Sequence, residues 1–166
     1  MEDARERVQR MERVSDARIA QDVAALRRTV HQRVVRAARE QALQRLAELT
    51  ETDEYADVLL DLAVEAVEAM SGHDFYLVLR PEGREAYGKD LPTNVVREAH
   101  ARLGRIVHVK LADEPLQAIG GIAVRDAEGH QVADQSFESR LERLWDDLRH
   151  AVAVRLPDEL TKENNG

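Results

Sequence analysis

The sequence predicts an α+β fold: a long N-terminal α-helix, suited to form a coiled-coil arm, followed by a small head of about four β-strands packed with helices. Two observations carry this prediction. The first glycine is Gly72 and the first proline is Pro81, so the preceding chain, rich in Ala, Arg, Glu, Gln and Leu, lacks both helix breakers. Beyond Gly72, short apolar runs alternate with turn residues and helical patterns. We therefore expect an N-terminal helical arm over 1–51, a C-terminal α+β head over 52–160 and a disordered tail over 161–166.

The predicted arm carries a narrow apolar stripe on an otherwise charged helix. Val8, Ile19 and Val30 are spaced by eleven residues, which is typical of a weak right-handed supercoil, but Ile19 with Leu26 and Val23 with Val30 fit a heptad. A narrow stripe is poorly stable alone, so we expect this helix to pair with a partner helix. About 45 residues of helix would span about 65–70 Å. The expected contact residues are Val8, Met11, Ile19, Val23, Leu26, Val30 and Val34.

The polar cluster over 50–54 is the one plausible break in this helical region. A second helix is expected over roughly 53–70, with Thr52 or Asp53 as its N-cap and Ser71-Gly72 as its end. Its apolar residues fall on one broad face, which is typical of packing against a core. They are Tyr55, Val58, Leu59, Leu62, Ala66 and Met70.

The next part of the chain is expected to contain two strands and one helix. Residues 75–79 and 106–109 are short apolar runs and are predicted to be strands. Residues 80–90 contain one proline and two glycines and are expected to form an exposed loop. Pro92 is expected to start a third helix that ends at Gly104. Its inward residues are Val95, Val96, Ala99 and Leu103.

A hairpin and a final helix complete the predicted head. Residues 122–124 form a strand, 126–129 a turn, and Val132 begins the returning strand. Asp134 and Ser136 can cap a helix that opens at about Phe137 and ends at Pro157. With helices on one face of the strands, the head is an α+β sandwich. The last helix is expected to bury Phe137, Leu141, Leu144, Trp145, Leu148 and Val152.

The composition and charge of the chain exclude several kinds of site and of binding partner. The chain has no cysteine, which excludes disulfides, thiolate metal ligands and cysteine nucleophiles. The N-terminus is charged from its second residue and no apolar run approaches the length of a membrane span, so we expect neither a signal peptide nor direct membrane insertion. Residues 1–49 hold eleven Arg against eight Asp or Glu and lack stacking aromatics, and the remainder is strongly acidic, so no nucleic-acid binding is expected.

No constellation of catalytic, cofactor-binding or metal-binding residues stands out. The six histidines are scattered, and no two of them have the spacing of three or four residues that binds a metal on one helix. Gly120-Gly121 lacks the lysine and hydroxyl residue of a phosphate-binding loop. We therefore expect no catalytic residue, no cofactor and no metal, and the chain is predicted not to be an enzyme.

Residues 120–144, GGIAVRDAEGHQVADQSFESRLERL, form a family signature. Two glycines, an apolar strand, a turn with Asp-x-x-Gly and a helix with an acidic residue, Arg and Leu resemble the end of the E subunit of the V-type and A-type ATPases, a protein of the peripheral stalk. Gln135 and Ser136 stand where the family usually has Asn-Thr. The matching residues are Gly120, Gly121, Gly129, Glu138, Arg140 and Leu141.

The resemblance implies a non-catalytic stator. In that family, the E subunit pairs with the G subunit as a heterodimeric coiled coil, and its head grips the A/B catalytic hexamer, mainly through the B subunit. Its N-terminal end reaches a membrane stator subunit. The strut lies at the cytoplasmic face of the membrane and resists rotor torque while proton or sodium transport is coupled to ATP synthesis or hydrolysis.

By this resemblance, seven residues of the head are expected to bind partners. Arg140 and Glu138 would anchor the head, either in an internal ion-pair network or at the B subunit. Two departures from the family are an arm shorter than usual and the absence of a Leu-Phe ending. The seven residues are Gly120, Gly121, Gln135, Ser136, Glu138, Arg140 and Leu141.

Two alternatives remain open at this point. The layout also fits a stator or regulator of a flagellar or type III export ATPase. A small ligand-binding or hydrolytic α+β domain would instead need a concave pocket in the head with converging histidines or carboxylates.

Overall fold

The computed structural model describes residues 2–155, with side chains over 5–151. Its packing divides the described residues into two compact units: Gln41–Leu148, here called the head unit, and a second unit made of residues 2–40 with residues 149–155. The predicted tail over 161–166 and the predicted helix end at Pro157 lie outside the described residues. Along the chain the elements are α1 (Glu2–Leu49), α2 (Tyr55–Ala69), β1 (Asp74–Val78), α3 (Pro81–Tyr87), α4 (Leu91–Leu103), β2 (His108–Leu111), β3 (Gly121–Asp126), β4 (Val132–Ser136) and α5 (Phe137–Arg155).

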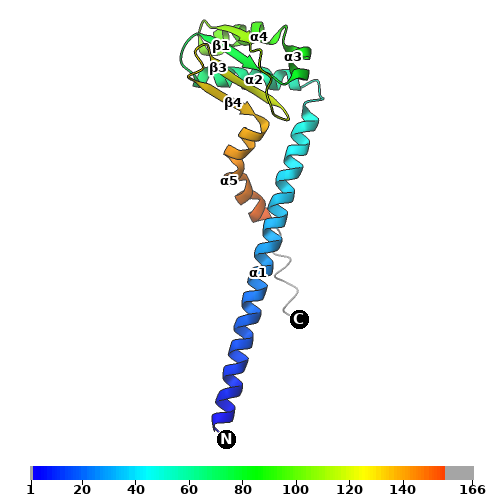
Figure 1. Cartoon of the computed structure of the whole chain (residues 1–166), viewed down its shortest axis with the longest axis vertical. Helices are drawn as coiled ribbons and strands as arrows, with labels where there is room; N and C mark the ends of the chain where they lie inside the picture. The colour runs from blue at the N-terminus through cyan, green and yellow to red at the C-terminus, as the bar shows by residue number, and fades with distance from the viewer. Residues whose placement is uncertain (1, 156–166) are drawn as a thin grey trace. The chain divides into compact units, whose positions relative to one another are not determined.

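The long N-terminal helix and the four-stranded head are both confirmed. Figure 1 shows α1 as one continuous helix, as the absence of Gly and Pro predicts. The strands form one mixed sheet in the order β2-β1-β3-β4. The pair β1–β2 is parallel, because α3 and α4 lie between them in the chain, and the other two pairs are antiparallel.

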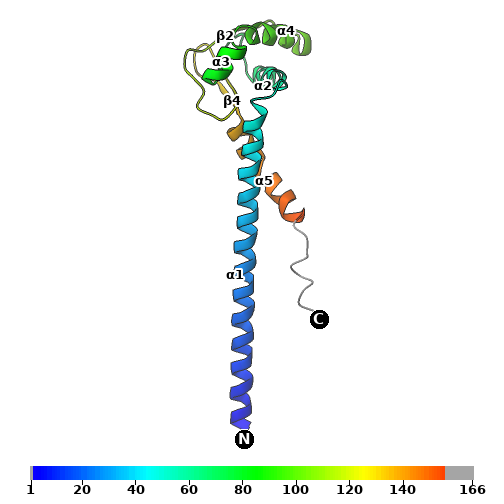
Figure 2. The same cartoon turned by 90° about the vertical axis from the view of Figure 1, so that its right-hand side faces the viewer.

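One face of the sheet holds the main core. Phe75 and Leu77 of β1 and Ile122 and Val124 of β3 are buried against α2 and α4, which pack side by side (Figure 2). Each fully buried side chain of this kind stabilises the fold by roughly 1.5–3 kcal/mol. Helices on one face of the sheet are thus confirmed. The α2 residues that the pattern predicts to face the core are buried there, apart from Val58, which is half-buried: Tyr55, Leu59, Leu62, Ala66 and Met70.

The other face of the sheet has a smaller apolar cluster. Val78 and Ala123 point to this side and pack with Ala112, and Leu116 adds partial cover. The segment after β2 stays close because the amide N–H of Leu116 donates to the carbonyl of Leu79 at 2.9 Å. A connecting segment, without any helix, therefore closes this face.

The prediction of an exposed loop over residues 80–90 is wrong for residues 81–87, and a turn follows at residues 88–90. Residues Pro81–Tyr87 form helix α3, with Pro81 in its first turn, where a missing N–H costs nothing. Arg84 fastens this helix, because its guanidinium donates to the Ala112 carbonyl at 2.6 Å. A Cβ at Gly88, in the turn after α3, would lie 2.7 Å from Leu111 Cδ1, so this buried glycine allows close packing.

Two finer predictions also need correction. The strand expected at 106–109 lies at His108–Leu111, because the chain joins β1 only when the His108 amide donates to the His73 carbonyl at 2.6 Å. Neither Thr52 nor Asp53 caps α2, whose N-cap is Glu54 and has no side-chain cap. The Thr52 hydroxyl instead donates to the Leu49 carbonyl at 2.9 Å and so closes the end of α1.

Helix α5 begins at Phe137 as predicted, but its apolar stripe is buried only at the start. Phe137 and Leu141 lie in the core, whereas Leu144 is 50% exposed and Leu148 is 41% exposed. Trp145 is half-buried, and the side chain of Val152 is outside the described part. The head unit therefore covers the stripe at Phe137 and Leu141 but leaves Leu144 and Leu148 largely uncovered.

Candidate partner-binding surfaces

The apolar stripe of α1 is open to solvent over much of its length. Successive residues of an α-helix are turned by about 100°, which places all seven predicted contact residues within a sector of about 140°. Five of them are between 44% and 74% exposed, namely Val8, Met11, Ile19, Val23 and Leu26. Val30 and Val34 are half-buried. From Val8 to Leu26 the arm therefore leaves a stripe of large apolar side chains exposed.

In the head unit, Gly120 and Gly121 lie where the start of β3 meets the end of β4. Gly121 has φ +86, and a Cβ there would lie 2.9 Å from Ser136 Cα and closer still to the Gln135 carbonyl oxygen. A Cβ on Gly120 would meet the Phe137 ring at 2.6 Å. The two glycines therefore allow the backbone and an aromatic ring to approach closely, which is a structural role inside the head unit.

Three side chains hold this glycine segment in place. The Gly121 amide donates to the Tyr55 hydroxyl at 3.0 Å, and the Ile119 amide donates to Glu138 Oε1 at 2.6 Å. The guanidinium of Arg80 donates to the Ile119 carbonyl. Burial raises the pKa of Tyr55, which keeps its hydroxyl neutral. Glu138, expected to bind a partner, thus already makes a contact within its own domain.

Gln135 and Arg140 belong to a polar network on the neighbouring surface. Arg140 Nη1 donates to Glu65 Oε2 and to Gln135 Oε1, each at 2.9 Å. Arg143 Nη2 donates to the same Gln135 oxygen, also at 2.9 Å. These contacts join α5 to α2 and to β4. Arg140 thus forms an ion pair with Glu65 inside the head unit, whereas Glu138, predicted to share a network with it, instead accepts the Ile119 amide.

The remaining predicted head residues are buried at the start of α5. Ser136 Oγ accepts a hydrogen bond from the Ser139 amide at 3.3 Å and caps the helix, as predicted, and Asp134 accepts from the Ser136 amide at 2.8 Å. Leu141 lies in the interior. All seven predicted head residues therefore cluster where β3, β4 and α5 meet. Glu138 and Arg140 keep partly exposed side chains, although one carboxylate oxygen of Glu138 is buried and the other accepts the Ile119 amide.

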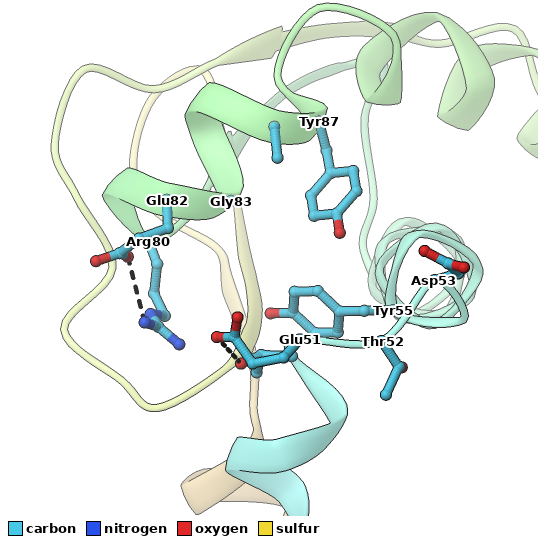
Figure 3. A pocket seen from close by; sticks show the side chains of 10 residues that line it. Glu51, Thr52, Asp53, Tyr55, Arg80, Glu82, Gly83 and Tyr87 are labelled. Atoms are coloured by element: carbon cyan, nitrogen blue, oxygen red, sulfur yellow. Dashed lines mark hydrogen bonds and ion pairs between the residues drawn. The ribbon is translucent and has the colours of Figure 1, made fainter.

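The head unit also has a hollow of about 300 Å³ between the α1–α2 turn and α3. Figure 3 shows Tyr87 pointing toward Tyr55, with Arg80 and Glu82 on the other side. The two tyrosine rings meet edge to face with centroids 5.8 Å apart, and Arg80 pairs with Glu82 at 3.3 Å. The hollow thus lies beside the side chains that hold the glycine segment. Within residues 5–151, whose side chains are described, no three His, Cys, Asp or Glu side chains gather closely enough to hold a metal ion.

Sequence reasoning missed the role of Arg105. Its guanidinium donates to the carbonyls of Val67, Met70 and Gly72 at 2.5, 3.0 and 2.7 Å, closing the end of α2, and it lies over the Phe75 ring. In the sequence, only its position directly after Gly104, which ends α4, could have indicated such a role. The carbonyls that it binds are more than thirty residues away in the chain.

Comparisons with known proteins agree on one family. A family model described as "ATP synthase (E/31 kDa) subunit" matches residues 1–156. The chain is similar to the E subunit of the A-type ATP synthase of Desulfurococcus sp. (strain SY), with 35% identity over 76% of this chain and 61% of that protein. It is also similar to the proteins of the same name from Thermococcus kodakarensis, with 31% identity over 86% of this chain and 68% of that protein, and Thermococcus onnurineus (strain NA1), with 37% identity over 75% and 58%.

These relatives are longer than the matched region. The chain spans about three fifths of the length of the curated relatives, with 61% and 60% of two of them covered. In the described residues, no helix combines the length and the apolar character that a bilayer crossing requires. Because the family model matches nearly the whole chain and these relatives carry the same name, the chain belongs to the ATP synthase (E/31 kDa) subunit family, the E subunits of V/A-type ATPases.

Proposed function

We propose that this chain is a non-catalytic peripheral-stalk subunit of a rotary V/A-type ATPase. In this role residues 1–51 are the arm, which pairs with the G subunit as a coiled coil, and residues 52–160 are the head, which binds the catalytic hexamer through its B and A subunits. The strut resists rotor torque while ATP synthesis or hydrolysis is coupled to proton or sodium transport. It lies at the cytoplasmic face of the membrane, with its N-terminal end at the membrane stator subunit.

The observation that carries this proposal is the exposed stripe on α1. Leaving Ile19, Val23 and Leu26 in water costs free energy that a second helix would recover, at about 25 cal/mol per Å² of apolar surface covered. A helix of 48 residues is also long enough to join two separate sites, at about 1.5 Å per residue. A strut needs these two properties: a stiff length and a partner that keeps it helical.

The head suits a binding role because its fold is fastened from several sides. Tyr55, Arg80 and Glu138 hold the glycine segment, and Arg140 joins α5 to α2. Leu144 and Leu148 add exposed apolar surface on the outer turns of α5, beside Arg140 and Arg143. We propose this part of α5, with Glu138 and Arg140, as the contact with the B subunit.

Purification from the protein's own cells tests the proposal. The chain would be tagged at its C-terminus and isolated in mild detergent, and the proteins that accompany it would be identified by mass spectrometry. We expect the A, B and G subunits of the ATPase. Recovery of the chain alone or as a homodimer would contradict the proposal.

A further inference from the structure

The middle of α1 is strongly basic. Residues 23–39 contain five arginines and one histidine, and no Asp or Glu occurs between Asp22 and Glu40. The preceding 22 residues are different, since they hold five arginines against six acidic residues. The positive charge of the arm is therefore concentrated in one stretch of about five turns.

Two of these arginines flank the apolar stripe. Arg27 and Arg33 stand three residues before and three residues after Val30, so at about 100° per residue they lie about 60° to either side of it. Leu26 and Val34 lie about 40° to either side of Val30, so Val30 is in the middle of the part of the stripe formed by residues 26–34. Positions on both borders of a stripe are those that face the charged borders of a partner helix in a coiled coil.

Arg27 and Arg33 have no counter-charge of their own. Both are exposed, and among the described residues neither side chain forms an ion pair or a hydrogen bond. Arg36, farther around the helix, is different because it pairs with Glu40 at 3.0 Å. Arg28 is also exposed but lies about 160° from Val30, on the opposite side of the helix.

We propose that the helix that pairs with the arm carries Asp or Glu along both borders of its own apolar stripe opposite residues 23–39, and that Arg27 and Arg33 select this helix and fix its register. The inference rests on the proposed coiled-coil role of the arm and adds the chemistry of the partner. Acidic borders would neutralise the two arginines while the apolar residues between them are covered.

Other occupants fit the same surface less well. A nucleic acid would neutralise the arginines but leave the valines and leucines between them without an apolar partner. A second copy of the chain in parallel register would place Arg27 and Arg33 against the same arginines, and like charges at these borders destabilise a coiled coil. An acidic partner helix satisfies the charge and the apolar stripe together.

The test compares the full-length chain with two charge-reversed variants. R27E/R33E changes both borders of the stripe, and R28E is the matched control on the far side. Each protein is titrated with the G subunit of the same ATPase and with two synthetic amphipathic helices that share one apolar stripe but have borders of Glu or of Lys. The Kd is measured at low and high NaCl, and circular dichroism checks that the helix content of the free proteins is unchanged.

We expect the Glu-bordered helix to bind the unaltered chain about tenfold more tightly than the Lys-bordered helix at low salt, with the difference reduced at high salt. R27E/R33E should reverse this preference and weaken binding of the G subunit about tenfold, while R28E changes both by less than about twofold.

The possible failures are distinct. If the G subunit binds but R27E/R33E and R28E bind it alike, the inference is wrong and the proposed function stands. If the G subunit does not bind the unaltered chain, the proposed function fails, and the two synthetic helices still decide the inference. Equal affinity for the two synthetic helices, or self-association of the chain that excludes both of them, overturns it.

Discussion

Substitution of Gly121 by alanine should weaken the fold far more than the size of a methyl group suggests. Gly121 has φ +86, a backbone conformation that costs about 1–2 kcal/mol for an L-residue with a side chain. The new Cβ would also lie 2.9 Å from Ser136 Cα and 3.1 Å from the Phe137 nitrogen. These are backbone atoms at the β4–α5 junction, so relief requires the junction to move, at a further cost of about 1–3 kcal/mol. The expected loss is about 2–5 kcal/mol.

Gly129→Ala is the matched control. Gly129 has φ +73, but a Cβ there would meet nothing within 4 Å, so only the conformational cost of about 1–2 kcal/mol applies. Urea unfolding of both variants would be followed by the fluorescence of Trp145, the only tryptophan, which lies in the head unit. An equal loss of unfolding free energy in the two variants would refute the close approach of β3 to the β4–α5 junction.

Three further substitutions test other contacts. Arg140→Ala removes the ion pair with Glu65 and should lower the free energy of unfolding by about 1 kcal/mol, a small loss because both side chains are partly exposed. Unchanged stability together with unchanged binding to the A/B hexamer would contradict both roles proposed for Arg140. Tyr55→Phe leaves the buried Gly121 amide without its acceptor and should cost about 1–3 kcal/mol in thermal unfolding at neutral pH. Burial raises the folded-state pKa of Tyr55, so above about pH 10 the unfolded chain loses the hydroxyl proton of Tyr55 first and the parent should lose stability. An equal loss of stability in Tyr55→Phe would show that ionisation of Tyr55 is not the cause. Burial opposes ionisation of Asp134, but hydrogen bonds from Ser139 and Ser136 outweigh it and lower the pKa of this carboxyl. The ionised carboxylate therefore stabilises the fold above its unfolded pKa, and this stabilisation is lost as the pH falls through its folded pKa. Asp134→Asn should flatten the decline in urea midpoint below about pH 4, and a decline identical to that of the parent would count against this.

The architecture could be predicted from the sequence where one physical rule dominated. Seventy-one residues without Gly or Pro have few alternatives to helix, and the turn at 126–129 between two short strands leaves little choice but a hairpin. The cap by Ser136 was predictable as well, because the residue types that cap a helix are few and act locally.

Predictions failed where a distant contact decided the outcome. Pro81, Gly83 and Gly88 indicated a loop, but Arg84 binds the Ala112 carbonyl and fixes a helix there. Equally, no local pattern could reveal that Arg105 reaches the end of α2, because Arg105 lies 33 to 38 residues further along the chain than the three carbonyls that it binds.

For the candidate site too, some residues could be predicted from the sequence and others depended on distant contacts. The glycines and Leu141 of the family signature were recognisable from sequence, and the structure gives them internal contacts, which explains why their residue types are needed without assigning them a partner. Leu144 and Leu148 continue a core-facing pattern but are exposed, because whether such a stripe is covered depends on how far the neighbouring elements extend. Their contact with the B subunit stays a prediction, as does that of the arm with the G subunit.

Site-directed photo-crosslinking in the intact complex would show whether the apolar stripe of α1 contacts the G subunit. A photoreactive residue would be placed at Val23, on the stripe, or at Arg28, on the far side of the same helix, and crosslinked proteins would be identified by mass spectrometry. We expect position 23 to crosslink to the G subunit in high yield and position 28 to do so little or not at all. Equal yields from the two positions, or crosslinks from position 23 only to a second copy of this chain, would contradict it.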